Sequence, residues 1–227
     1  LTATVAANSN SVLPSGSVSF IDKADQFSLG TATLGVTKTA LSVAAGGSAA
    51  TGIDPDFVVA TDFNGDGKMD LAVANDPELV EETGSGVTIL LGNGDGTFTA
   101  APSFYTGSVY GLAVADFNND GKPDLAISSD ANSITIMLGH GDGTFTLAGT
   151  APTGAGPTTI MAGDFNGDGN ADLAVTTSID GVSILLGNGD GTFTEGTAIP
   201  NGNDASYIAV GDFNGDGKAD LAITETD

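Results

Sequence analysis

Four nine-residue stretches of the chain carry oxygen-bearing side chains at the same positions. Each has Asp at positions 1, 5 and 9, Asn at position 3 and Gly at position 6, and they span 62–70, 116–124, 164–172 and 212–220. Calcium takes six to eight oxygen ligands at about 2.3–2.6 Å, and a loop curled around a point supplies them on alternate residues. The Gly permits the positive φ of a sharp bend. The four stretches therefore predict four calcium-binding loops, numbered 1 to 4 in chain order.

The predicted ligands are the side chains at positions 1, 3, 5 and 9 and the backbone carbonyl at position 7. Because position 7 would turn only its carbonyl inward, its side chain is free to be Lys or Asn. The predicted metal residues are Asp62, Asn64, Asp66, Lys68 and Asp70 in loop 1; Asp116, Asn118, Asp120, Lys122 and Asp124 in loop 2; Asp164, Asn166, Asp168, Asn170 and Asp172 in loop 3; and Asp212, Asn214, Asp216, Lys218 and Asp220 in loop 4.

Charge excludes several classes of partner. The formal net charge is -24, and all five cationic side chains are lysines. Five lysines are too few to neutralise a phosphate backbone or an anionic lipid surface. We therefore expect no binding to nucleic acid and no membrane insertion. The predicted loops hold 12 of the 29 acidic residues, and four bound Ca²⁺ would change the net charge from -24 to -16. We therefore expect folding to be linked to calcium.

The composition also bears on where the protein works. The chain has no Cys, so disulfides say nothing of its redox compartment, and a zinc site is not expected. No run approaches the ~20 apolar residues of a membrane helix. Weak oxygen-rich calcium sites are filled where calcium is millimolar, so we expect a secreted or cell-surface protein. The absence of Cys together with abundant Gly, Thr, Ser and Asp suggests a bacterial one. The start at Leu1, without a signal peptide, suggests a processed or trimmed chain.

A second motif repeats in phase with the loops. Leu-Gly-x-Gly-Asp-Gly-Thr-Phe occurs at 91–98, 138–145 and 186–193, while the loops start 54, 48 and 48 residues apart. Short strands in a period of 40–50 residues are typical of propeller blades. Each period is expected to hold two strands around the acidic loop, a third strand, a Gly-Asp-Gly hairpin and a fourth strand. The predicted fold is all-β, with about four repeats of four-stranded antiparallel blades in an incomplete or small ring.

The acidic motifs differ from two well-known kinds of calcium loop. An EF-hand needs a Glu at position 12 and a following helix, whereas position 12 here is Val73, Ile127, Val175 or Ile223. Nonapeptide calcium repeats recur every nine residues, unlike the Gly-Asp-Gly motif. The hairpin aspartates are instead expected to cap turns. These are Asp95, Asp142 and Asp190.

The loops and hairpins together closely resemble FG-GAP repeats, also called VCBS repeats, of integrin-α-like β-propellers. The resemblance covers Ile53 to Asp227. It implies that Ca²⁺ binds the Asp, Asn and Asp residues of each loop, between the first two strands of a blade, and stiffens it. It also implies a role in adhesion, in lectin-type glycan binding, or as a scaffold beside an enzyme.

The first fifty residues differ, and two alternatives stay open. Residues 1–50 resemble part of a bacterial Ig-like repeat, while 51–227 hold the propeller repeats. Alternatively, Val18 to Gly30 is half a blade that pairs with Leu221 to Thr224 and closes a ring. The repeats could also belong to a longer protein, form a four-bladed ring, or be completed by other chains. Open strand edges would favour a homo-oligomer.

Nothing in the sequence favours catalysis, and we expect no enzyme. The only histidine, His140, stands where the sister hairpins have Asn93 and Asn188, so a turn role is expected. The main hypothesis is an extracellular calcium-binding module for adhesion or for recognition of a cell-surface glycan or protein. The alternatives are a subunit of a calcium-stabilised surface fibre or sheath, and an accessory domain of a polysaccharide-degrading enzyme.

Two further features are candidate contact surfaces. The acidic insertion at 76–83 in the first repeat is a partner site or, more simply, a solvated hairpin tip. Three tyrosines could stack on a ligand, although packing within strands is the simpler expectation for each. They are Tyr105, Tyr110 and Tyr207.

Overall fold

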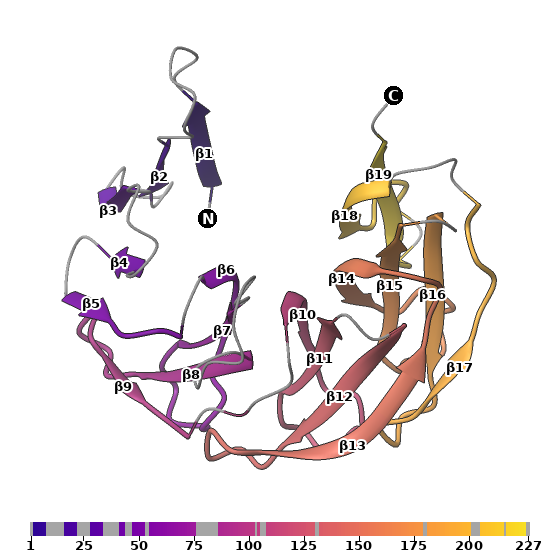
Figure 1. The fold of residues 1–227 in the computed structure, drawn as a ribbon, viewed down its shortest axis with the longest axis horizontal. Coiled ribbons are helices and arrows are strands. Elements are labelled where there is room, and N and C mark those ends of the chain that lie inside the picture. Colours follow the sequence, from indigo (N-terminus) through magenta and orange to yellow (C-terminus); the bar gives the residue numbers. More distant parts are fainter. Residues whose placement is uncertain are drawn as a thin grey trace.

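The computed structural model of the chain shows only strands, turns and loops among the residues that it describes (Figure 1). Within 49–227 it describes all residues except 53–54, 76–85, 103, 105–107, 130–131, 179–180, 201–204, 216 and 226–227, and the backbone alone of 206 and 225. Before residue 49 it describes the backbone of five strands. The insertion at 76–83, Tyr105 and Asp216 lie outside the described residues.

Three successive four-stranded antiparallel sheets form the centre of the chain, and each pairs its strands in sequence order. Blade 1 contains β6 (Pro55–Thr61), β7 (Asp70–Asn75), β8 (Gly86–Gly92) and β9 (Phe98–Ala100). Blade 2 contains β10 (Val109–Ala115), β11 (Asp124–Ser129), β12 (Ser133–Gly139) and β13 (Phe145–Pro152). Blade 3 contains β14 (Pro157–Gly163), β15 (Asp172–Thr177), β16 (Gly181–Gly187) and β17 (Phe193–Glu195). The predicted all-β fold with four-stranded blades is confirmed.

The fourth unit repeats the first half of a blade. Strands β18 (Ala205–Gly211) and β19 (Asp220–Glu225) form a two-stranded antiparallel sheet that brackets loop 4. Their register also shifts near the start of the first strand, as it does in all three full blades. Each acidic loop thus connects the first two strands of a unit, as the sequence predicts.

The units follow one another along an open arc (Figure 1). Strands β6, β10, β14 and β18 lie on its concave side, and β9, β13 and β17 lie on its convex side. The described units do not close into a ring, so the expectation of an incomplete ring is confirmed and the small closed ring is not found.

The N-terminal strands pair among themselves. Strands β1 (Thr2–Ala7), β2 (Gly16–Ile21) and β3 (Ser28–Thr33) form one antiparallel sheet, and β4 (Leu41–Val43) pairs with β5 (Gly47–Ala49). Strand β2 pairs with β1 and β3, and β19 pairs with β18. The ring-closing alternative stays a prediction. The Ig-like assignment and the boundary at residue 50 stay predictions.

The apolar core lies between neighbouring blades. One cluster joins Ala72 and Ile89 of blade 1 to Leu112 and Ile127 of blade 2, and a second joins blades 2 and 3 in the same way. The second strand of each full blade is buried almost throughout, which accounts for its continuous Leu-Ala-Val or Leu-Ala-Ile run. Packing of blade on blade therefore positions the acidic loops.

Candidate metal centres in the acidic loops

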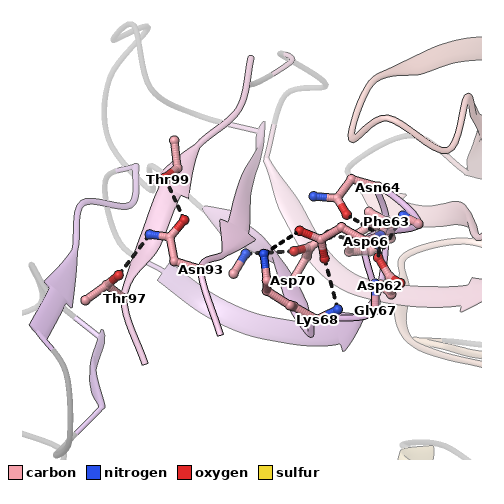
Figure 2. Close-up of polar contacts among 12 residues, drawn as sticks. Asp62, Phe63, Asn64, Asp66, Gly67, Lys68, Asp70, Asn93, Thr97 and Thr99 are labelled. Carbon is pink, nitrogen blue, oxygen red and sulfur yellow. Dashed lines mark hydrogen bonds and ion pairs between the residues drawn. The ribbon is translucent and has the colours of Figure 1, made fainter. Parts of the chain in front are cut away.

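The first aspartate of loop 1 organises the backbone of the whole loop. Asp62 Oδ1 accepts the backbone N–H groups of Gly65 at 2.8 Å and Asp66 at 3.1 Å, while Oδ2 accepts that of Gly67 at 2.7 Å (Figure 2). Gly67 has a φ of 82°, which only Gly adopts readily. The carboxylate at position 1 therefore holds the bend that the sequence predicts.

Positions 3 and 5 continue this pattern of side chain to backbone bonds. Asn64 Oδ1 accepts the Asp66 N–H at 2.9 Å, and Asp66 Oδ1 accepts the Lys68 N–H at 2.9 Å. The Lys68 ammonium donates to Asp66 Oδ2 at 2.9 Å. The hydrogen bond from the Lys68 side chain, and to a smaller extent the one from its backbone N–H, holds the pKa of Asp66 below its ordinary value.

The other loops repeat these bonds. The carboxylate at position 1 accepts the N–H of the Gly at position 6 in each, at 2.7 Å in loop 2, 3.0 Å in loop 3 and 2.9 Å in loop 4. The Asn at position 3 accepts the N–H of position 5 in loops 2 and 3, at 3.0 Å and 2.7 Å. In loops 1 to 3 the structure thus places the predicted residues at positions 1, 3 and 5 around the same turn.

The aspartate at position 9 has a second, structural role that the motif alone does not predict. Asp124 is fully buried, and its Oδ2 accepts the Phe117 N–H at 2.8 Å while its Oδ1 accepts the Gly139 N–H at 2.8 Å. It therefore ties its loop to the end of the third strand. Asp70 and Asp172 do the same with Gly92 and Gly187.

Burial and hydrogen bonding act on this carboxyl in opposite directions. Burial raises the pKa of Asp124, and the N–H bonds from Gly139 and Phe117 oppose that rise. Burial likewise raises the pKa of Asp172. Only Gly fits at the end of the third strand, because a Cβ at Gly139 would collide with the Pro123 carbonyl.

The hairpin aspartates cap turns, as predicted. Asp142 Oδ1 accepts the N–H of Thr144 at 2.9 Å and its hydroxyl at 2.6 Å, and this lowers the pKa of Asp142. Asp95 and Asp190 make the same pair of bonds. The turn role of His140 is also confirmed, since its Nε2 lies 2.6 Å from the Thr146 hydroxyl.

The phenylalanine at loop position 2 links blade 1 to blade 2 and blade 2 to blade 3. The Phe117 carbonyl accepts the Gly191 N–H of blade 3 at 2.9 Å. Its buried ring meets the Phe193 ring edge-on, with centroids 5.5 Å apart. Phe63 contacts Gly143 and Phe145 of blade 2 in the same way. The recurrence of Phe in all four loops and all three hairpins was the signal for this contact.

Comparison with known families agrees with this architecture. The FG-GAP-like repeat family matches residues 62–127, 116–175 and 164–223. The chain belongs to the FG-GAP-like repeat family. Repeats of this family are typically extracellular modules and are generally structural rather than catalytic. A search of curated proteins found no match. No helix capable of spanning a membrane occurs in the part of the chain that the structure describes.

The fourth FG-GAP loop differs from the others in how its last aspartate is held. Asp220 is half-buried, and its Oδ2 accepts the N–H groups of Phe213 at 2.9 Å and Asn214 at 3.2 Å. Its Oδ1 accepts the Asn214 side-chain amide at 3.3 Å instead of a third-strand Gly. The local loop bonds therefore form without the buried environment found in blades 1–3.

The donor atoms of the loops fit a hard cation. Among the described residues, no three carboxylate, imidazole or thiol side chains are gathered as a ready-made metal group. The loops nevertheless combine two or three carboxylates with an amide oxygen and backbone carbonyls, which is the donor chemistry of calcium. A carboxylate offers about four lone-pair sites, and Asp124 accepts two hydrogen bonds. Lone pairs thus remain for a cation even on the buried carboxylate at position 9.

Proposed function

We propose that this FG-GAP repeat chain is an extracellular calcium-binding module for adhesion or for recognition of a glycan or protein. The observation that carries the proposal is the repetition of one loop, with the same side chain to backbone bonds, between the first two strands of successive units. Membership in a family of extracellular repeats supports it.

The ligands in each loop would be the Asp, Asn and Asp at positions 1, 3 and 5, the carbonyl at position 7 and the Asp at position 9. Bound calcium would supply positive charge against carboxylates that otherwise repel one another. The aspartate at position 9 also holds the third strand, and the Phe at position 2 contacts the next blade. Calcium that orders a loop would therefore also stabilise the packing between blades.

The first strands of the units carry exposed apolar side chains that are candidates for recognition. Tyr207 of β18 is 70% exposed and Tyr110 of β10 is 39% exposed. Packing within the strand, predicted from the sequence, is therefore wrong for Tyr207. Val58 of β6 is also exposed, so the first strands of three units present apolar surface. Exposed aromatic rings stack on the apolar faces of sugars and on protein side chains, which supports the proposal.

A glycan array probed with the purified chain, in millimolar calcium and in EDTA, tests this function. We expect binding to a defined sugar that is lost in EDTA and weakened by Tyr207→Ala. Tyr207→Phe, which keeps the ring, is the matched control. A folded chain that binds no glycan and no cell-surface protein would contradict the recognition role. Calcium-dependent polymerisation in the same sample would favour the fibre or sheath subunit instead.

A further inference from the structure

We infer that the residue at loop position 7 grades the calcium affinity of the first three loops, with Lys68 and Lys122 weakening loops 1 and 2 and Asn170 leaving loop 3 the tightest. This inference rests on the proposed calcium binding and adds a ranking of the sites to it. Position 7 would contribute only its carbonyl to the metal, so its side chain is free to tune the site.

The first observation is the ion pair within loops 1 and 2. The Lys68 ammonium lies 2.9 Å from Asp66 Oδ2 (Figure 2). The Lys122 ammonium lies 3.5 Å from Asp120 Oδ2. In both loops the paired carboxylate is the predicted ligand at position 5. A cation that takes this oxygen must compete with the ammonium and remain close to its positive charge.

The second observation is that these lysines are held in place over their own hairpins. A Cβ at Gly94 would lie 2.9 Å from Lys68 Cδ, and one at Gly141 would lie 3.1 Å from Lys122 Cδ. The aliphatic stems therefore pack on the bare faces of the hairpin glycines. This packing keeps the ammonium beside the loop instead of leaving it free to swing into solvent.

Loop 3 has the same architecture with an uncharged residue at position 7. Asn170 lies over Gly189 as the lysines lie over their glycines, and its Oδ1 accepts the Asn119 side-chain amide of loop 2 at 2.9 Å. The oxygens of Asp168 accept the Asn170 N–H at 2.8 Å and the neutral Asn166 amide at 2.9 Å. Loop 3 thus has no lysine at position 7, whereas in loops 1 and 2 the lysine at that position offsets the carboxylate at position 5.

One lysine of the next unit also faces loop 3. A Cβ at Gly167 would lie 3.4 Å from Lys218 Cε, so this side chain passes the edge of the loop at position 4. Its Nζ lies 3.8 Å from the same Cβ position, and the neighbouring Asp168 has its two oxygens bonded to Asn170 and Asn166. Lys218→Met is therefore a useful separate variant, expected to tighten loop 3 less than Lys122→Met tightens loop 2.

Calcium titration calorimetry on the metal-free full chain at low salt tests the ranking. The variants are Lys68→Met and Lys122→Met, which keep the aliphatic stem and remove the charge, and Asn170→Lys, which adds the charge to loop 3. We expect each Met variant to tighten one site by up to about fivefold, the range for a partly exposed ion pair. Asn170→Lys is expected to weaken the tightest site by a similar factor.

The controls separate charge at the loop from other causes. Lys23→Met removes the same charge outside the acidic loops and is expected to titrate as wild type. The differences should shrink at high salt, because screening weakens interactions between exposed charges. Melting in EDTA confirms that each variant is folded, and Lys68→Gln provides a second uncharged side chain should Lys68→Met fail to fold.

Two negative results have different meanings. If the wild type binds calcium but the Met variants and Asn170→Lys leave every affinity unchanged, the ranking is overturned and the proposed calcium binding stands. If the wild type releases no heat with calcium and melts alike with and without it, the proposed calcium binding fails, and the ranking fails with it.

Discussion

Loops 2 and 4 have almost the same sequence but different surroundings. Phe117 in loop 2 is 1% exposed, whereas Phe213 at the same position in loop 4 is 62% exposed. Asp124 is fully buried and bonded to a third-strand Gly, whereas Asp220 bonds within its own loop. Nevertheless, the aspartate at position 1 accepts the Gly N–H at position 6 in both loops.

The comparison separates two levels of structure. The turn itself follows from residues inside the nine-residue stretch, since the Asx-type bonds and the positive φ of Gly recur in both loops. Burial of the Phe and of the last Asp comes from the third strand and from the next blade. Loops of nearly the same sequence should therefore differ in what they contribute to stability.

The largest difference is expected at the phenylalanine. Phe117→Ala removes a buried ring from the contact between blades 2 and 3 and should lower the free energy of unfolding by about 3–5 kcal/mol. Phe213→Ala, the matched change at an exposed ring, should cost less than about 1 kcal/mol. Urea denaturation of both variants in EDTA measures the difference without a contribution from metal. Equal losses would show that the contact with the next blade contributes little.

A smaller difference is expected at the last aspartate. Asp124→Ala leaves the buried N–H groups of Phe117 and Gly139 without their acceptor, which should cost about 3 kcal/mol. Asp220→Ala should cost about 1 kcal/mol, because its hydrogen-bond partners are more exposed and can bond to water. Urea denaturation in EDTA again gives both values. A larger loss for Asp220→Ala would contradict this structural role of the buried carboxylate.

Much of this architecture could be predicted from the sequence because it is local and repeated. The acidic loops, the hairpins capped by Asp142 and its counterparts, and the place of His140 follow from comparing repeats. The bonds of Asp124 to Gly139 and of Phe117 to Gly191 join separate motifs, so only the packed blades reveal them. The packing role predicted for Tyr207 is wrong because strand alternation does not tell whether another blade covers a given face of a strand.

The smallest effect is expected at the capped hairpins, where the capping Asp142 is exposed. The lowered pKa of Asp142 means that its ionised form stabilises the fold above its unfolded pKa of about 4, and that this contribution is lost as pH falls through the lowered pKa. Asp142→Asn should therefore melt lower than wild type at neutral pH and more nearly equal to it in strong acid. Melting at both pH values measures this, and a difference that grows in acid would contradict the cap.

Thermal unfolding of the wild-type chain in millimolar calcium and in EDTA tests the central claim most directly. At a calcium concentration about ten times Kd, each filled loop should add about 1.4 kcal/mol. For a chain of this length this corresponds to about 3–6 °C per site. We predict a clearly higher melting temperature in calcium, with magnesium at the same concentration as the control. Equal melting temperatures in calcium and EDTA would contradict the proposal that these FG-GAP loops bind calcium.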